Sequence, residues 1–406
     1  MSGKVSGTEP RGNSGGSPSC AGHIYGRCDG SPEADRPLPL KYVTKFEYGD
    51  ALAQDVRGEG STPVFGSNGV VGSHDVANTL APSIIVGRKG SFGKVTWADV
   101  PAFCIDTAYY IDKRHTKANL RWLYWMLQTL GLDMFSEDTG VPGLSREKAY
   151  RVHVPYPPLP EQTRIANFLD EQTARINALI AEKERLDVLL GEYRGSLISA
   201  AVTGYLDVSA GTAVPKTEKR NEPVTNCQLK HLASMKSGES ISSDEILQDG
   251  PYPVYGGNGL RGYTGNYTHA QTGPLIGRQG ALCGNVTFVS GAFWATEHAI
   301  VATPREGVWP RWLFWLLEGL DLNQYSVAAA QPGLAVEALT RVRTVKPQFS
   351  TQVRIANFLD EQTARIDDLR NHCREHIALL REYRSSLISA AVTGQLDIDS
   401  FEKGVA

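Results

Sequence analysis

RIANFLDEQTARI occupies residues 164–176 and occurs again, unchanged, at residues 354–366. A second stretch, SLISAAVTG, occupies residues 196–204 and recurs at residues 386–394. Both recurrences have the same offset of 190 residues, from 164 to 354. A repeat of this length indicates two copies of one structural unit. The chain is therefore predicted to be an internal duplication.

Each repeated segment belongs to a predicted long helix, the first over residues 160–203 and the second over 350–393. Pro160 suits the first helical turn, and Glu161 suits the positive end of the helix dipole. Gly204 and Gly394 are the expected stop signals. A helix of about 44 residues spans roughly 65 Å, so each copy is predicted to contain a long rod.

Apolar residues recur along both helices in steps of three and four, which predicts a coiled-coil seam. The residues predicted to bind the opposite helix or a partner are Ile165, Phe168, Leu169, Ile176, Leu179, Leu186, Leu190, Tyr193, Leu197, Ile355, Phe358, Leu359, Ile366, Leu369, Leu380, Tyr383 and Leu387. Lys183, Cys373 and His376 interrupt the seam. They set the register or contact a partner, or they are a snorkelling lysine and two tolerated small polar residues; we favour the second interpretation.

The segments before the helices are predicted to be mixed globular domains. Short apolar runs at 63–66 and 83–87 alternate with glycine turns and predict strands, and the dense apolar run 121–127 predicts a helix. The same anchors recur 190 residues later, with different sequence between them. The predicted fold is α+β, with two mixed globular domains separated by a pair of long helices. The helices can pair parallel or antiparallel, and we favour the antiparallel pair, which gives a pseudo-twofold repeat. The predicted parts are a disordered tail at 1–30, domain 1 at 31–158, helix 1 at 159–206, a linker at 207–228, domain 2 at 229–348, helix 2 at 349–398 and a tail at 399–406.

Bulk properties exclude several classes of protein. The net charge of −3 gives no global basic field, so any nucleic-acid surface must be a local patch. No apolar run is long enough to span a membrane, and the N-terminus lacks the apolar region of a secretory signal. The six cysteines never form a CxxC motif, and Cys20, His23 and Cys28 lack the spacing of a zinc site. We expect a cytoplasmic protein with reduced thiols and no metal.

The order of domains and helices, together with PPLPEQ at 157–162 and SLISAAVTG at the helix end, resembles the specificity subunit of type I restriction–modification enzymes. The resemblance covers residues 36–398. It implies that each target-recognition domain reads one half of a bipartite, asymmetric site in double-stranded DNA, and that the helical pair sets the unread spacer. It also implies two methyltransferase (modification) subunits that use S-adenosylmethionine, two restriction (translocase and nuclease) subunits that use ATP and Mg²⁺, and no cofactor on this chain.

The chain has only weak candidates for catalytic or nucleotide-binding motifs. Tyr156-Pro157-Pro158-Leu159 lacks the flanking residues of an adenine-methyltransferase motif and suits a helix start. The glycine-rich run 87–95 has neither the spacing nor the final Ser or Thr of a P-loop. Glu297-His298 has no second ligand near it in sequence, and such a pair is usually a surface polar group. A non-catalytic subunit is predicted.

Glycine-rich turns bring backbone close to DNA, and polar side chains beside them can reach phosphates or base edges. The predicted DNA-binding residues are Asn68, Arg88, Lys89, Lys94, Asn258, Arg261, Arg278 and Gln279. Arg88 and Arg278 occupy equivalent positions, so the alternative for both is a structural or phosphate role. Lys89 and Gln279 are equivalent but different, which favours a role in sequence choice.

Two further hypotheses stay open at this stage. A duplicated coiled-coil adaptor that binds no DNA would have the same repeat. A specificity subunit of a methylation-only or phage-exclusion system, without a nuclease, would have the same sequence features.

Overall fold

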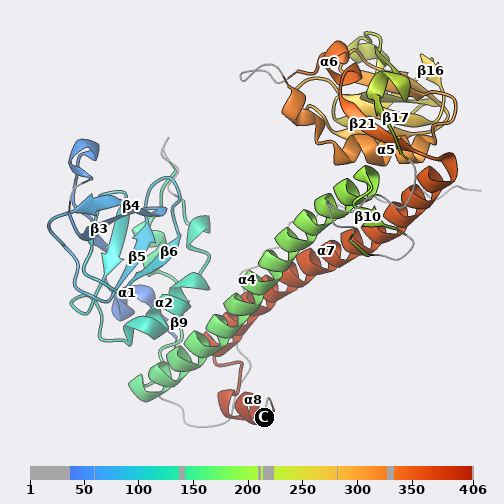
Figure 1. Ribbon diagram of the computed structural model, residues 1–406. Helices are drawn as coiled ribbons and strands as arrows, with labels where there is room; N and C mark the ends of the chain where they lie inside the picture. Colours follow the sequence, from blue (N-terminus) through green and yellow to red (C-terminus); the bar gives the residue numbers. More distant parts are fainter. Residues whose placement is uncertain are drawn as a thin grey trace, which may run out of the picture. The chain divides into compact units, whose positions relative to one another are not determined.

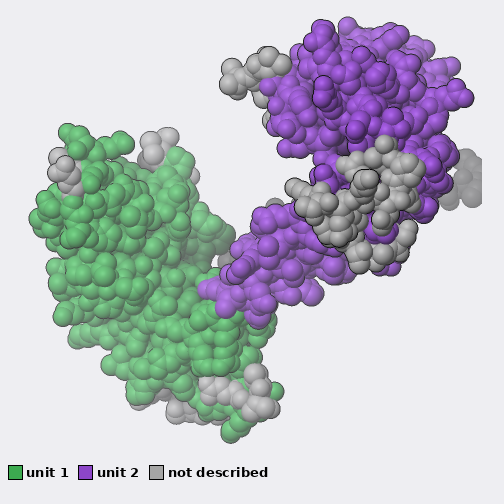
Figure 2. Space-filling view, in the orientation of Figure 1, with its two compact units in different colours: residues 1–176, 382–406 green, residues 177–381 purple. Residues whose placement is uncertain are grey.

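The computed structural model describes residues 37–58, 60–136, 142–208, 212–213, 224–280, 282–326 and 333–404. The chain divides into two compact units, residues 1–176 with 382–406 and residues 177–381 (Figure 2). Each unit contains one mixed domain and part of each long helix. The predicted tail at 1–30, with Cys20, His23 and Cys28, lies outside the described residues.

The domain of unit 1 is built on a four-stranded antiparallel sheet of order β2-β8-β5-β6. These strands are Glu47–Tyr48, Ala108–Ile111, Ser83–Gly87 and Val95–Ala98. A second sheet, β4-β3-β7, consists of Gly69–His74, Thr62–Gly66 and Phe103–Cys104, and β1 (Leu38–Pro39) pairs with β9 (His153–Val154). The helices are α1 (Leu40–Val43), η1 (Gln54–Val56), α2 (Leu120–Gln128), η2 (Leu132–Met134) and α3 (Arg146–Tyr150). The predicted strands and helix at 63–66, 83–87 and 121–127 are therefore confirmed.

The domain of unit 2 repeats this plan. Its two four-stranded sheets have the orders β13-β20-β17-β18 and β15-β14-β19-β16. The strands are Ala233–Ser237, Ala299–Pro304, Gly273–Gly277 and Val286–Val289 in the first sheet, and Gly259–Thr264, Tyr252–Gly256, Ala292–Ala295 and His269–Ala270 in the second. The helices are η3 (Leu229–His231), η4 (Ser243–Glu245), α5 (Pro310–Gly319), η5 (Leu322–Tyr325) and α6 (Val336–Thr340).

Two segments differ from the sequence-based prediction. The end of the predicted linker forms β12 (Val224–Gln228), which pairs with β21 (Arg343–Pro347), and its beginning contributes to a β10–β11 pair (Leu206–Asp207 and Thr212–Ala213). The predicted C-terminal tail contains helix α8 (Ile398–Gly404), where Phe401 packs edge-on against Phe168. Strand β12 and helix α8 are stabilised by contacts distant in sequence, which local composition does not reveal.

The two long helices are confirmed as α4 (Leu159–Thr203) and α7 (Phe349–Val392), which lie side by side and antiparallel (Figure 1). Gly204 and Gly394 follow them with φ of 77° and 72°. A residue with a Cβ is strained in this left-handed region, so glycine is the natural terminator.

Only some of the residues predicted for the coiled-coil seam face the opposite helix, and the others are exposed. Leu179, Leu186 and Tyr193 are 46, 40 and 57 % exposed, and the equivalent Leu369 and Tyr383 are 54 and 47 % exposed. The inward-facing positions include Ile176, Ile180, Lys183, Asp187, Leu190 and Arg194 in α4 and Ile366, Arg370, Cys373, Ile377, Leu380 and Arg384 in α7. The apolar pattern was misleading because several seam positions are charged. His376 is exposed, whereas Cys373 is buried as predicted.

The repeated stretch joins each domain to its helix. In unit 1, Oδ1 of Asp170 accepts hydrogen bonds from Arg121 Nε at 2.7 Å and Trp125 Nε1 at 2.8 Å. In unit 2, Asp360 accepts from Arg311 Nε and Trp315 Nε1, both at 2.8 Å. This arrangement, which we call the aspartate clamp, is the same in both units. The aspartate clamp thereby holds α2 in one orientation on α4 in unit 1, and α5 in one orientation on α7 in unit 2.

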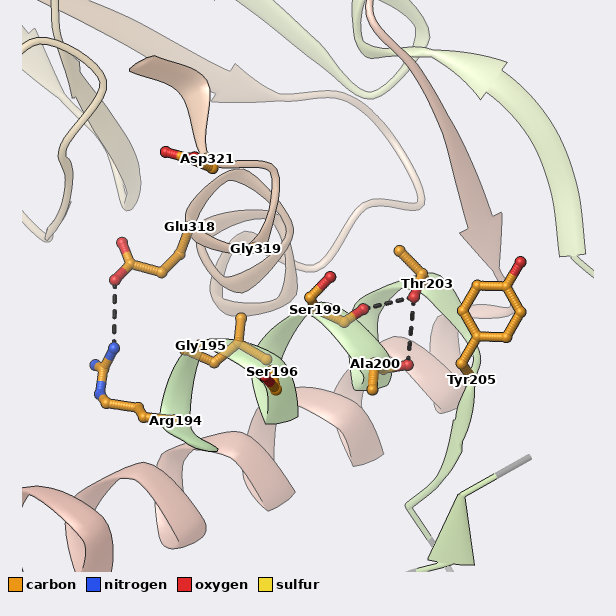
Figure 3. A pocket seen from close by; sticks show the side chains of 11 residues that line it. Arg194, Gly195, Ser196, Ser199, Ala200, Thr203, Tyr205, Glu318, Gly319 and Asp321 are labelled. Carbon is orange, nitrogen blue, oxygen red and sulfur yellow. Dashed lines mark hydrogen bonds and ion pairs between the residues drawn. The ribbon is translucent and has the colours of Figure 1, made fainter. Parts of the chain in front are cut away.

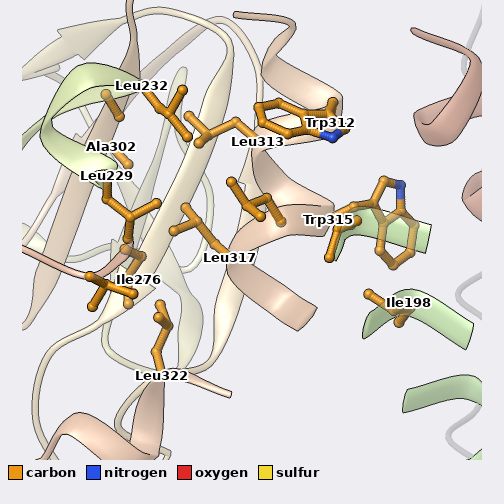
Figure 4. Close-up of a cluster of buried hydrophobic side chains, with 14 of the residues drawn as sticks. Ile198, Leu229, Leu232, Ile276, Ala302, Trp312, Leu313, Trp315, Leu317 and Leu322 are labelled. Carbon is orange, nitrogen blue, oxygen red and sulfur yellow. The ribbon is translucent and has the colours of Figure 1, made fainter. Parts of the chain in front are cut away.

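The hydrophobic core of unit 2 continues from the sheet through α5 into α4 (Figure 4). Trp312 and Leu313 are fully buried, and Ile198 of α4 belongs to the same cluster. A close-packed interior transmits displacements. The domain and this part of α4 therefore form one rigid body within the unit.

Unit 1 contains a fully buried carboxylate, Asp112, at the end of β8. Burial raises its pKa, but hydrogen bonds from Arg114 Nε at 3.0 Å and from the backbone N–H groups of Leu80 and Arg114 outweigh that effect and lower the pKa to about 2. A depressed pKa stabilises the fold above the pKa of the unfolded state, about 3.9. That contribution, about 2 kcal/mol, is lost as the pH falls through the range from about 4 to 2.

We expect Asp112→Asn to remove this pH dependence. Unfolding of unit 1, followed by hydrogen exchange of β5 and β8 amides between pH 6 and 2.5, should show a smaller acid-induced loss of stability in the variant than in the wild type. Asp75→Asn, at an exposed position, serves as the control. An identical pH profile for wild type and Asp112→Asn would contradict the assignment.

Candidate nucleic-acid interface

Two glycine-rich turns of unit 1 meet at one end of the domain. The β3–β4 hairpin turns at Ser67-Asn68, and the loop 88–94 follows β5. A Cβ on Gly87 would lie 2.8 Å from the carbonyl oxygen of Ser67 and 2.4 Å from that of Ser91. Only glycine permits this approach, so Gly87 brings the two turns together.

Three of the four residues predicted in domain 1 lie exposed on these turns, namely Asn68, Lys89 and Lys94. Lys94 Nζ donates to the carbonyl oxygen of Asn68 at 2.8 Å and to its Oδ1 at 3.0 Å. The ammonium group is thereby fixed beside an amide that can still donate. This pairing suits a cation that meets a phosphate and an amide that meets a base edge.

Arg88 is half-buried and is used inside the domain. Its guanidinium stacks 4.8 Å from the ring centroid of Tyr48, and Nη1 donates to the carbonyl oxygen of Asp106 at 3.1 Å. In unit 2, Arg278 Nη1 donates to Ser237 Oγ at 3.1 Å. The geometry favours the structural alternative for both arginines.

Unit 2 builds the same pair of turns. A Cβ on Gly277 would lie 2.2 Å from the carbonyl oxygen of Gly257, so the hairpin turn at 257–258 packs on the loop after β17 as in unit 1. Asn258, Arg261 and Gln279 are exposed there. Residues 89 and 279 also occupy equivalent backbone positions, because Lys89 bridges to Gly143 and Gln279 bridges to Gly333.

The structure adds Glu297 and His298 to the unit 2 site, which sequence reasoning had set aside as an ordinary surface pair. His298 Nδ1 lies 2.9 Å from Gln279 Oε1, and its Nε2 lies 3.3 Å from Glu297 Oε1. The imidazole therefore holds the amide of Gln279. A histidine 19 residues from a predicted site residue gave no local signal, because only the loop before β20 brings it there.

A separate cavity of about 770 Å³ lies between the end of α4 and the end of α5 in unit 2 (Figure 3). Arg194 and Glu318 pair across it at 3.4 Å, and the Thr203 hydroxyl donates back to the carbonyl oxygen of Ser199. Neither histidine nor cysteine occurs among its lining residues. Its lining carboxylates are Glu318, which pairs with Arg194, and Asp321.

Within the described part of the chain, no group of three or more His, Cys, Asp or Glu side chains is arranged to hold a metal ion. The helices described there also include none long and apolar enough to cross a membrane.

Two alike domains on paired helices, with matching turns that display different side chains, define an internally duplicated protein. Its family follows from comparison with known proteins. The family model for the type I restriction modification DNA specificity domain matches residues 40–187 and 221–378, and the chain belongs to this family. The predicted non-catalytic role agrees with a family of specificity subunits.

Relatives and a solved structure support the assignment. The EcoprrI type I restriction enzyme specificity subunit of Escherichia coli is 42 % identical over 137 residues, 33 % of this chain and 34 % of that protein. The EcoBI specificity subunit of Escherichia coli is 30 % identical over 125 residues, 30 % of this chain and 26 % of that protein. The matches thus span about a third or less of these relatives. A chain from a structural study of assembly and conformational transition in the type I R-M system has the same fold, with a TM-score of 0.64 at 14 % identity over 91 % of this chain and 100 % of that chain.

Proposed function

We propose that this chain is the DNA sequence-recognition subunit of a type I restriction–modification complex in the cytoplasm. Each domain reads one half of a bipartite, asymmetric site in double-stranded DNA, and the paired helices set the spacer between the halves. The chain itself is non-catalytic and binds no cofactor. S-adenosylmethionine, ATP and Mg²⁺ act in its partner subunits.

The observation that carries this proposal is that equivalent backbone positions of the two domains bear different side chains. Lys89 in unit 1 becomes Gln279 in unit 2, Lys94 becomes Asn285, and Val71 becomes Arg261. The hairpin turns and the backbone bridges of residues 89 and 279 match in the two units, while the loop after β17 is one residue longer than the loop after β5. Amide and guanidinium groups recognise different base edges, so one scaffold with two sets of side chains is suited to two different half-sites.

The outer faces of the long helices support a docking role for partner subunits. Leu179, Leu186, Leu189 and Tyr193 of α4 are exposed, as are Leu369, Leu379 and Tyr383 of α7. Exposed apolar residues that recur along a helix mark protein interaction sites. We assign these faces to two modification subunits, which in turn accompany two restriction subunits.

A duplicated coiled-coil adaptor that binds no DNA is the second candidate. Divergent exposed side chains on otherwise constant turns are harder to explain for an adaptor whose two copies meet equivalent partners. A methylation-only or phage-exclusion system would use the same recognition geometry and differs only in its partner genes.

Co-expression with a cognate modification subunit tests the proposal. Methylated adenines mapped across the host genome should fall in a split, asymmetric motif that disappears when this chain is omitted. Formation of a complex without sequence-dependent methylation would favour the adaptor. Cleavage of unmethylated DNA on adding a restriction subunit would separate a full restriction system from a methylation-only one.

A further inference from the structure

The middle of the helical pair carries complementary charges on its two helices. In unit 2, Asp187 of α4 accepts from Arg370 Nε at 2.8 Å and lies 3.4 Å from Arg374 Nη2. Glu184 accepts from Arg381 Nη2 at 2.7 Å. We call these five residues the central charge layer. Its acids are all on α4, and its arginines are all on α7.

The layer has a half-buried centre. The side chains of Asp187 and Arg370 are 21 and 26 % exposed, and the hydrogen bond from Arg370 lowers the pKa of Asp187 below its ordinary value. A Cβ on Gly191 would already lie 3.5 Å from the guanidinium carbon of Arg370. Arg370 therefore packs against the backbone of α4 at Gly191, where a Cβ would be in ordinary van der Waals contact with its guanidinium group. Partial burial makes the Asp187–Arg370 contact less screened than a surface pair, whereas Glu184, Arg374 and Arg381 are more than half exposed.

The layer lies in the part of the helices where the two copies differ. The stretches 164–176 and 196–204 of α4 are identical to 354–366 and 386–394 of α7. Because these ends are identical, they would pair equally well between α4 and α7, between two α4 helices or between two α7 helices. We call the last two arrangements pairs of like helices. Between them, Ile180, Glu184 and Gly191 in α4 are replaced by Arg370, Arg374 and Arg381 in α7.

Within the central charge layer, pairs of like helices would place like charges together. Residue 374 of α7 is the equivalent of residue 184 of α4, so in the same antiparallel register Asp187 of one α4 would face Glu184 of a second copy. Two α7 helices would place Arg374 of one against Arg381 of the other. Unfavourable contacts in an alternative arrangement give specificity beyond that of the favourable ones, and charges beside a coiled-coil seam are known to set partner choice.

We propose that the central charge layer makes α4 and α7 selective for each other, so that the helical pair forms within one chain and pairing of two chains through like helices is opposed. The identical stretches join each domain to its helix in the same way. The central charge layer differs between α4 and α7, and it supplies the asymmetry that a duplicated coiled coil otherwise lacks.

Three full-length chains test the proposal by their mass in solution over a concentration series. They are the wild type, a neutral variant (E184Q/D187N/R370Q/R374Q/R381Q) and a reversed variant (E184R/D187R/R370E/R374E/R381E). We expect the wild type and the reversed variant to keep the mass of one chain. The neutral variant should form two-chain particles with a dissociation constant at least about tenfold lower. Equal masses for all three chains, or two-chain particles of the reversed variant, would overturn the proposal.

A second measurement covers the case in which the neutral variant does not fold. E184R/D187R alone should lower the urea midpoint of unfolding, and adding R370E/R374E/R381E should restore it. E182R/E192R makes the same change in charge at exposed positions of α4 and serves as the control. The proposal fails if E184R/D187R is no less stable than this control, or if the reversed α7 residues do not rescue it.

Discussion

Asp360→Ala is expected to lower the free energy of unfolding of unit 2 by about 2 kcal/mol. One oxygen of Asp360 accepts two hydrogen bonds at 2.8 Å, from Arg311 and Trp315. Its removal leaves the buried indole N–H without its acceptor and the guanidinium group without its counter-ion. Arg311 and Asp360 are 32 and 37 % exposed, so solvent screening keeps the effect below that of a fully buried pair.

Hydrogen exchange of α5 amides and urea unfolding together measure this change. Glu361→Ala is a matched control, because Glu361 is the next residue and forms only an exposed pair with Arg365. We expect the control to change stability by less than about 0.5 kcal/mol. Asp170→Ala should weaken α2 of unit 1 by a similar amount to Asp360→Ala in unit 2. Equal effects of Asp360→Ala and Glu361→Ala would show that the aspartate clamp contributes little.

The aspartate clamp changes the explanation of the repeated stretch. Its identity in both copies first indicated an internal duplication. The structure shows that Asp170 and Asp360, within that stretch, fix each domain to its helix. Gln162 and Gln352, just before it, accept from the backbone N–H groups of Asn119 and Trp309, both at 2.8 Å. The repeated stretch is therefore the same in both copies because it makes the same hydrogen bonds between domain and helix in each unit.

Local signals predicted the elements well, because they act over a few residues. Proline, glycine and the spacing of apolar residues located both long helices, and β5 followed from a short apolar run between turns. The aspartate clamp could not be predicted, since Arg121 and Asp170 are 49 residues apart. Strand β12 was missed because its sequence, VTNCQ, has few apolar residues and depends on pairing with β21.

The seam was misassigned for a physical reason. Apolar periodicity identifies a buried face only when the buried face is apolar. In the centre of α4, Asp187 and Arg194 point inward while Leu186 and Tyr193 are exposed. The leucines therefore mark an exposed outer face of the helical pair. The charges mark the contact between the helices.

In the recognition site, the turns were predictable and the environment of their side chains was not. Glycine spacing identified both pairs of turns. The sequence also indicated that Lys89 and Gln279 are equivalent, and their matching backbone bridges agree with that indication. The support of Gln279 by His298, and the pairing of Lys94 with Asn68, depend on loops that meet only in the folded domain.

Gln279→Ala is expected to relax sequence choice at one base of one half-site, by about 1–3 kcal/mol in discrimination. His298 contacts Gln279 Oε1 at 2.9 Å, which fixes the amide so that its NH₂ group points away from the imidazole nitrogen. A fixed amide selects one pattern of donors and acceptors, whereas an alanine selects none. Methylated sites mapped in cells that carry the variant should show several bases at that position, while the other half-site stays unchanged.

Lys89→Ala, at the equivalent position of unit 1, is the matched control for this prediction. The Lys89 ammonium group carries its charge whichever DNA group it meets, so its loss should weaken DNA binding and reduce the slope of log K against log salt by about 1. Gln279→Ala should leave that slope unchanged, because an amide releases no counter-ions. The two variants thus separate selectivity from electrostatic affinity at one backbone position. If Gln279→Ala instead reduced the salt slope and kept the motif intact, Gln279 would have no role in sequence choice.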